Sequence, residues 1–167
     1  MQKPEIIENA LTPIEFEAIH AIIGGFNFPW HWFPRLNSYQ KLKNEKLNHS
    51  YLYHNFNIYN NNVAAPYDQI FIPLLKFLKV KVLIRMHANM YMHTSKIEEH
   101  TDHKDQGFPC QAAILYLNTC NGSTVIKKEH RVMSVANRLV KFRGDWLHHS
   151  TSSTDQKRRL VLNINYI

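Results

Sequence analysis

The chain of 167 residues has little cysteine, little glycine and no long apolar segment. Its 2 cysteines, Cys110 and Cys120, exclude both a disulfide framework and a four-cysteine zinc site. With only 5 glycines and 7 prolines, the chain is neither collagen-like nor of low complexity. No segment approaches the roughly 18 apolar residues of a transmembrane helix, and the N-terminus lacks an apolar run of signal-peptide length. These absences predict a cytoplasmic protein without a membrane partner.

The chain does contain an average share of hydrophobic residues, an excess of histidine and a surplus of positive charge. Hydrophobic residues make up 44%, which with this length predicts a single folded domain over residues 1–167. The net charge is +7, but the basic residues are spread over short clusters and only weakly indicate nucleic-acid binding. The 11 histidines pose a sharper question, because histidine is the commonest metal ligand.

Residues 1–79 are expected to form a helical N-terminal support. The segment from Thr12 to Glu15 reads as a capping box with Pro13 at the first helical position, and Gly24-Gly25 should end that helix. A second helix is predicted over 66–78, kinked or shortened by Pro73.

Residues 80–167 are expected to form strands. Over 80–93 the sequence alternates strictly, which puts Met86, Ala88 and Met90 on one face and Arg85, His87, Asn89 and Tyr91 on the other. Further strands are predicted at 111–118, 123–128, 137–143 and 159–166. Two helices followed by a run of strands predict an α+β, mainly β fold in which the helices cover one face of a sheet or barrel.

A candidate metal site begins with His100-Thr101-Asp102. Residues two apart in an extended segment share a face, so this imidazole and carboxylate could bind one ion. A third ligand, His148 or His149, follows nearly fifty residues later. Two histidines and one carboxylate form the facial triad of non-haem Fe(II) oxygenases, which leaves coordination positions open. His103 follows Asp102 directly and should point to the opposite side.

Arg158-Arg159 opens the last predicted strand, ten or eleven residues after the histidine pair. With this arginine the chain resembles the 2-oxoglutarate/Fe(II)-dependent dioxygenases, which carry a His-x-Asp, a distal histidine and an arginine about ten residues later. The fragments 114–118, 121–124 and 135–142 are also similar to that family. The nearest likeness is to its prolyl-4-hydroxylase-like branch, particularly small phage and marine microbial members. The resemblance spans about residues 80–167.

The resemblance implies a double-stranded β-helix, a jelly-roll or cupin-like core with helices packed on one sheet. It implies Fe(II), 2-oxoglutarate and O₂ as cofactors and raises ascorbate as an auxiliary reductant. The substrate would be a peptidyl (prolyl-like) group or a small molecule, with nucleic acid less favoured. The site residues that it implies are the metal ligands His100, Asp102 and His148 and the 2-oxoglutarate-binding residues Arg159 and Tyr116. Tyr91 and Asn89, which share the polar face of the strand over 80–93, are further candidates for binding the cosubstrate or the substrate.

Several alternatives stay open at this point. Arg159 is preferred to Arg158 because it shares the polar face of the last strand. The resemblance favours His148 over His149, because the family often places a small residue two positions after the distal ligand and Ser150 stands there. A non-catalytic barrel that binds a metal or nucleic acid, and a cupin-like metalloenzyme that does not use 2-oxoglutarate, are the competing functional interpretations.

Overall fold

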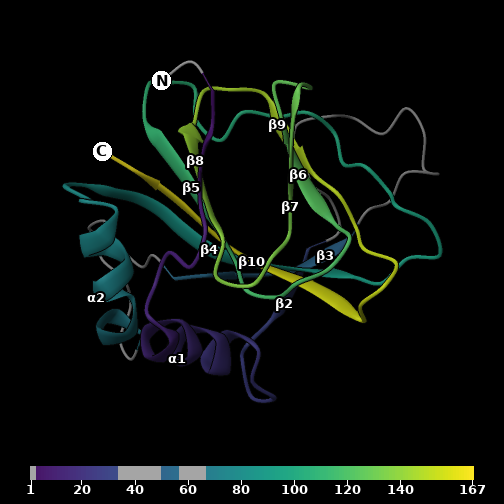
Figure 1. Cartoon of the computed structure of the whole chain (residues 1–167), viewed down its shortest axis with the longest axis horizontal. Coiled ribbons are helices and arrows are strands. Elements are labelled where there is room, and N and C mark those ends of the chain that lie inside the picture. Colours follow the sequence, from purple (N-terminus) through teal and green to yellow (C-terminus); the bar gives the residue numbers. More distant parts are fainter. Residues whose placement is uncertain (1–2, 34–49, 57–66) are drawn as a thin grey trace.

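The computed structural model describes residues 3–33, 50–56 and 67–167 (Figure 1). In chain order its elements are β1 (Glu5–Ile7), α1 (Pro13–Ile23), β2 (His31–Phe33), β3 (Tyr51–Asn55), α2 (Asp68–Phe77), β4 (Leu83–Met92), β5 (Gln111–Tyr116), β6 (Ser123–Ile126), β7 (His130–Met133), β8 (Leu139–Arg143), β9 (His148–Ser150) and β10 (Arg158–Tyr166).

The strands form two antiparallel sheets. The large sheet has the order β1-β8-β5-β10-β4-β3-β2, and the small one has the order β7-β6-β9. Figure 1 shows the small sheet on one side of the large sheet and both helices on its other side. This arrangement confirms the predicted mainly β, jelly-roll architecture with helices on one sheet.

The two helices begin where the sequence predicts helix starts or close to them. In α1 the Glu15 N–H donates to Thr12 Oγ1 (3.4 Å) and the Thr12 N–H donates to Glu15 Oε2 (3.0 Å), which confirms the capping box. Helix α2 runs through Pro73, and the predicted start at residue 66 lies outside the described residues. Neither of these described helices has the length and apolar character needed to cross a membrane.

The central strands β4 and β10 separate an apolar layer from a polar one. Met86, Ala88 and Met90 of β4 and the leucines of β10 pack with α1 and α2 in the main core. This confirms the predicted direction of the apolar face. Strict alternation would place Leu83 on the polar face with Arg85. It lies on the helix side instead, because the β4–β10 register shifts between Asn165 and Tyr166.

The N-terminal part contains three short strands besides the two predicted helices. Strand β1 pairs with β8, and β2 and β3 extend the large sheet beyond β4. Asn137, with a positive φ of 61°, holds the chain before α1 through two hydrogen bonds to the Leu11 backbone (3.0 and 2.8 Å). These short strands had too few residues for a periodic signal, so pairing with the long strands decided their conformation.

Candidate metal centre and cavity

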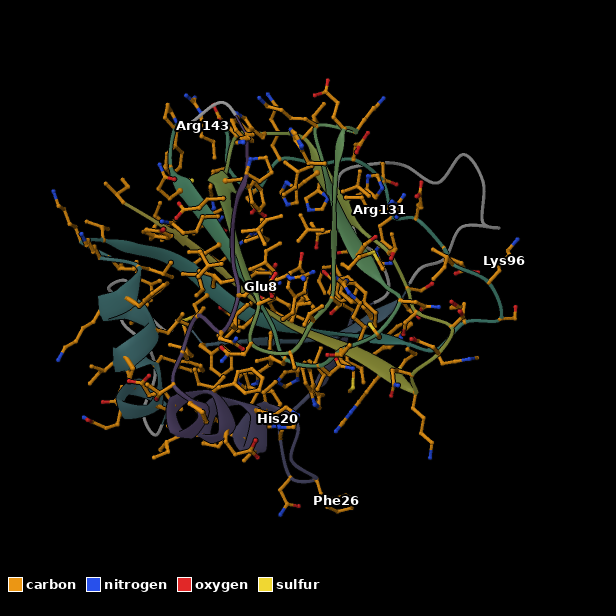
Figure 2. The ribbon with its side chains drawn as sticks, in the orientation of Figure 1. Glu8, His20, Phe26, Lys96, Arg131 and Arg143 are labelled. Carbon is orange, nitrogen blue, oxygen red and sulfur yellow. The ribbon has the colours of Figure 1, made fainter. Side chains whose placement is uncertain are left out.

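The space between the two sheets holds a cavity of about 370 Å³. Figure 2 shows side chains from both sheets projecting into this space. The lining residues are mostly polar or aromatic, and they come from β2, β3, β4, β5, β9, β10 and the loop after residue 102: Phe33, Tyr51, Tyr53, Arg85, His87, Asn89, Tyr91, His103, Lys104, Asp105, Ile114, His148, Ser150 and Asn163.

Three of these side chains form a group that could hold a metal ion. His103, Asp105 and His148 each offer one ligand atom, and these atoms lie within 4.8 Å of one another. The backbone fixes the two histidines, because His103 and His148 form an antiparallel bridge in which each N–H donates to the other's carbonyl (2.9 Å). Residues opposite each other in such a bridge present their side chains on the same face.

The two imidazoles of this inner cluster, His103, Asp105 and His148, are oriented by backbone carbonyls. His148 Nδ1 lies 3.0 Å from the Trp146 carbonyl oxygen, and His103 Nδ1 lies 3.1 Å from the Thr101 carbonyl oxygen. Because a carbonyl oxygen can only accept, such a bond places the ring proton on Nδ1 and leaves the lone pair of Nε2 free. Metal-binding histidines are usually held in this way. Burial lowers the pKa of His148, and this favours the neutral, ligating form.

The carboxylate of the inner cluster is also held on both oxygens. Arg85 donates to Asp105 Oδ1 (2.5 Å), and Asn165 Nδ2 donates to Asp105 Oδ2 (3.0 Å), which lies 3.6 Å from His148 Nε2. Burial alone would raise the pKa of Asp105, but the neighbouring His148 and Arg85 outweigh burial and lower it. The group is therefore an oriented, ionised carboxylate beside two imidazoles whose Nδ1 atoms bond to backbone carbonyls.

The structure does not bring the three predicted ligands together, because His100 and Asp102 line a different pocket from His148. Asp102 Oδ1 instead lies 2.7 Å from His149 Nδ1. A separate outer pocket contains this pair, with the lining Glu99, His100, Asp102, Val125, Lys128, Arg131 and His149. We call His100, Asp102 and His149 the outer cluster. Among the described residues only the inner cluster brings three ligand atoms within 4.8 Å.

One extra residue between two bridges explains this difference. Besides the bridge between His103 and His148, the segment forms a bridge between Glu99 and Thr151. Four positions separate Glu99 from His103, but only three separate His148 from Thr151. The segment before His103 therefore bulges, and a one-residue irregularity reverses the side on which later side chains point. The assumption of regular extended backbone, on which the choice of His100 and Asp102 depended, fails there.

Arg159 lies on the inward face of β10, as predicted, and is fully buried. Its guanidinium donates to the Thr124 hydroxyl (3.1 Å) and to the Thr151 carbonyl (3.3 Å). It forms no ion pair with any residue that the structure describes, and its Nε has no hydrogen-bond partner there. A buried cation without a carboxylate is costly, so this position suits an incoming anion.

A glycine makes room for this arginine. A Cβ at Gly122 would lie 2.6 Å from Arg159 Cδ and 2.7 Å from the Ser152 carbonyl oxygen. The absence of a side chain at Gly122 therefore leaves the space that the arginine occupies.

The other predicted cofactor-binding residues surround Arg159. Its guanidinium carbon lies 5.3 Å from the centre of the Tyr91 ring and 5.6 Å from that of Tyr116. Asn89 Nδ2 donates to the Tyr91 hydroxyl (3.1 Å). Tyr91 and Asn89 also line the cavity, so they connect the surroundings of Arg159 with the inner cluster. Arg158 lies on the opposite face and donates to the Gly24 carbonyl (2.8 Å), outside this group.

Sequence reasoning missed Arg85, Asn165 and Thr124 as parts of the site and set His103 aside. A signal for His103 was present, because His103-Lys104-Asp105 is a second His-x-Asp motif three residues after the first. Arg85 and Asn165 were assigned to the inward faces of their strands, but their convergence on Asp105 depends on how the loop after residue 102 folds back.

No family model and no curated protein matches this sequence. Solved structures do match it in fold. A prolyl hydroxylase from Trichoplax adhaerens, solved with a hypoxia inducible factor peptide fragment, superposes with a TM-score of 0.70 at 11% identity, covering 98% of this chain and 83% of that one. The chain has the fold of the 2-oxoglutarate/Fe(II) oxygenases.

Two further structures have the same fold. An oxidoreductase of the 2OG-Fe(II) oxygenase family from Burkholderia pseudomallei has a TM-score of 0.68 at 11% identity, covering 98% of this chain and 84% of its own. HygX from Streptomyces hygroscopicus, solved with nickel and 2-oxoglutarate, has a TM-score of 0.60 at 10% identity, covering 98% and 82%. These likenesses confirm the predicted fold, which encloses the inner cluster and Arg159.

Proposed function

We propose that this protein is a 2-oxoglutarate- and Fe(II)-dependent oxygenase that hydroxylates a peptidyl or small-molecule substrate. The inner cluster carries the proposal, since two imidazoles and one oriented carboxylate are the donor set of a facial triad. The buried, unpaired charge of Arg159 supports it independently, because the cosubstrate is a dicarboxylate. The shared fold with oxygenases solved with metal and 2-oxoglutarate adds further support.

In this proposal His103, Asp105 and His148 hold Fe(II), in place of the set His100, Asp102 and His148. Their Nδ1 bonds to backbone carbonyls keep both imidazoles in the ligating tautomer, and Arg85 keeps the carboxylate ionised. The alternative of His100 and Asp102, now with His149 as the nearest histidine, stays a prediction that paired variants can test.

Arg159 is assigned to the distal carboxylate of 2-oxoglutarate, with the Thr124 and Tyr116 hydroxyls beside it. A guanidinium presents a planar fork of donors that matches a carboxylate. Tyr91 would line the path between that carboxylate and the metal, and Asn89 Nδ2 donates to its hydroxyl. Fe(II), 2-oxoglutarate and O₂ together supply the oxidation, in which one oxygen atom enters a substrate C–H bond while the cosubstrate is converted to succinate and CO₂.

The test is release of succinate from 2-oxoglutarate by the purified chain with and without Fe(II). We expect Fe(II)-dependent succinate, slow in the absence of substrate. Arg159→Leu should raise the KM for 2-oxoglutarate about 100-fold, since a charged hydrogen-bonded contact of about 3 kcal/mol is lost. Arg158→Leu is the matched control and should leave this KM within about twofold. Equal effects of the two variants would contradict the assignment of Arg159.

The competing interpretation is a barrel that binds a metal or nucleic acid without catalysis. It predicts no succinate at any iron concentration, together with affinity for DNA or RNA that falls steeply with salt. The two measurements on one preparation separate these functions.

A further inference from the structure

Three buried polar atoms in the cavity have no hydrogen-bond partner among the described residues. They are His87 Nδ1, Asn89 Oδ1 and Asn163 Nδ2. The side chains of His87 and Asn89 are more than nine-tenths buried, with 7% and 6% exposure, and all three residues line the cavity. A buried polar atom without a partner costs roughly 1–3 kcal/mol, so three such atoms on residues that line one cavity indicate a ligand.

The three groups lie close together on neighbouring strands. Asn163 pairs with His87 across β10 and β4, and Asn89 follows His87 by two residues on the same face. Opposed side chains have Cβ atoms roughly 5 Å apart, and residues two apart on a strand lie roughly 7 Å apart. Since Asn89 Nδ2 already donates to the Tyr91 hydroxyl, Asn89 offers an acceptor, while Asn163 offers a donor.

The walls around these groups are aromatic. The Tyr53 and His87 ring centres lie 5.3 Å apart, the Tyr51 and Tyr91 centres 5.6 Å apart, and the Phe33 and Tyr51 centres 5.4 Å apart. Rings at these separations provide flat apolar surfaces on which another ring can stack. Asp105, the carboxylate in the lining, is already paired with Arg85, so the subsite itself offers neutral hydrogen-bonding groups.

We propose that His87, Asn89 and Asn163 form a substrate subsite for a neutral planar ring whose edge carries an N–H beside a C=O, as in a lactam. The ring N–H donates to Asn89 Oδ1, and the ring carbonyl accepts from Asn163 Nδ2. The Tyr53 and Tyr51 rings flank the bound ring. The proposal rests on the proposed function, because Arg85 and Asn165, two residues further along the same strands, contact Asp105 of the inner cluster. A ring bound here therefore lies beside the metal.

The test is ligand binding without turnover, measured by ligand-observed NMR on the full chain with three probes. Uracil carries both the ring and the lactam edge, 1,3-dimethyluracil keeps the ring but lacks the N–H, and acetamide keeps the amide but lacks the ring. We expect saturable binding of uracil and at least tenfold weaker binding of both other probes. Equal affinity for uracil and 1,3-dimethyluracil would show that the N–H is not recognised. Equal affinity for uracil and acetamide would show that the ring is not recognised.

Two variants test whether uracil binds at the proposed subsite. Asn163→Leu should weaken uracil about tenfold, through loss of one buried hydrogen bond. Gln156→Ala, which removes an amide from an exposed position, is the matched control and should leave affinity unchanged. A prolyl peptide that saturates the site while uracil does not would overturn the proposal in favour of a peptide substrate.

The failure of this proposal and the failure of the proposed function would give different results. Uracil binding without any Fe(II)-dependent succinate would leave the subsite standing and overturn the oxygenase. Succinate release without uracil binding would support the oxygenase and overturn the subsite.

Discussion

Two His-x-Asp motifs three residues apart, 100–102 and 103–105, have different surroundings in the folded chain. The second contributes to a cluster enclosed between the sheets, where Asp105 is bonded by Arg85 and Asn165. The first supplies Asp102 to an outer pocket, where its neighbours include the exposed Lys128 (3.8 Å). The composition of the motif is the same, so the difference lies in the supporting bonds and in the backbone register, which decide which motif could hold a metal.

The largest expected contrast is between the two carboxylates. Asp105→Ala should reduce Fe(II)-dependent succinate release at least 100-fold, because it removes a charged ligand of the proposed site. Asp102→Ala should change the rate by less than about threefold. Rates at saturating 2-oxoglutarate and Fe(II) affinities for both variants check this. If Asp102→Ala abolishes turnover and Asp105→Ala does not, the outer cluster holds the metal.

The bonds that orient the inner carboxylate provide a finer comparison. Asn165→Leu should weaken Fe(II) binding roughly 10- to 100-fold, the usual cost of losing a group that orients a metal ligand. Lys128→Met removes the corresponding neighbour of Asp102 and should leave Fe(II) affinity unchanged. Metal titration followed by competition with a chelator measures both. A purely structural role for Asn165 would instead lower the free energy of unfolding without changing the affinity of the folded protein.

The buried histidines of the cavity predict a pH dependence of stability. Burial, with the nearby Arg85 charge, lowers the pKa of His87 to about 3. The unfolded chain takes up this proton near pH 6.5, so the contribution of His87 to stability is complete above pH 6.5 and is lost as the pH falls toward 3. From pH 7 to pH 5 the free energy of unfolding should fall by about 2 kcal/mol from this residue.

Urea unfolding of the metal-free protein at pH 7 and pH 5 measures this loss. His87→Gln should reduce the pH dependence, whereas His130→Gln, a change on β7 outside the cavity, should leave it as in the parent protein. The same pH dependence in all three proteins would show that His87 does not carry it.

The smallest expected effect lies at the rim of the outer pocket. Arg131 donates to Glu99 (2.5 Å) with both side chains about half exposed, and Figure 2 shows Arg131 on the side of the small sheet. Arg131→Met should cost about 1 kcal/mol of stability, since the exposed ion pair contributes little and one hydrogen bond to Ser123 Oγ (2.7 Å) is also lost, and should not alter succinate release. Denaturant unfolding and the turnover assay check the two parts. A large loss of turnover would mean that the outer pocket takes part in the reaction.

Much of the fold could be predicted from the sequence because its signals are local. The alternation over 80–93 gave the face of β4 that packs on the helices, and the capping box gave the start of α1. Strands β7 and β9 were not predicted, since four and three residues are too few for a period to be read. The sequence also predicted a site of two histidines, one carboxylate and an inward arginine, and the metal ligands themselves stay a prediction.

The sequence by itself determined which residues lie on the two faces of the long strands, because side chains alternate with a period of two wherever pairing is regular. Arg159, Asn89 and Tyr91 were placed correctly on the inward face for that reason. Only the tertiary structure decided which His-x-Asp motif meets His148. That choice depends on one extra residue between two bridges, and the bridges join segments almost fifty residues apart. Such a shift leaves no trace in local periodicity, yet it changes which side chains of this segment lie opposite His148.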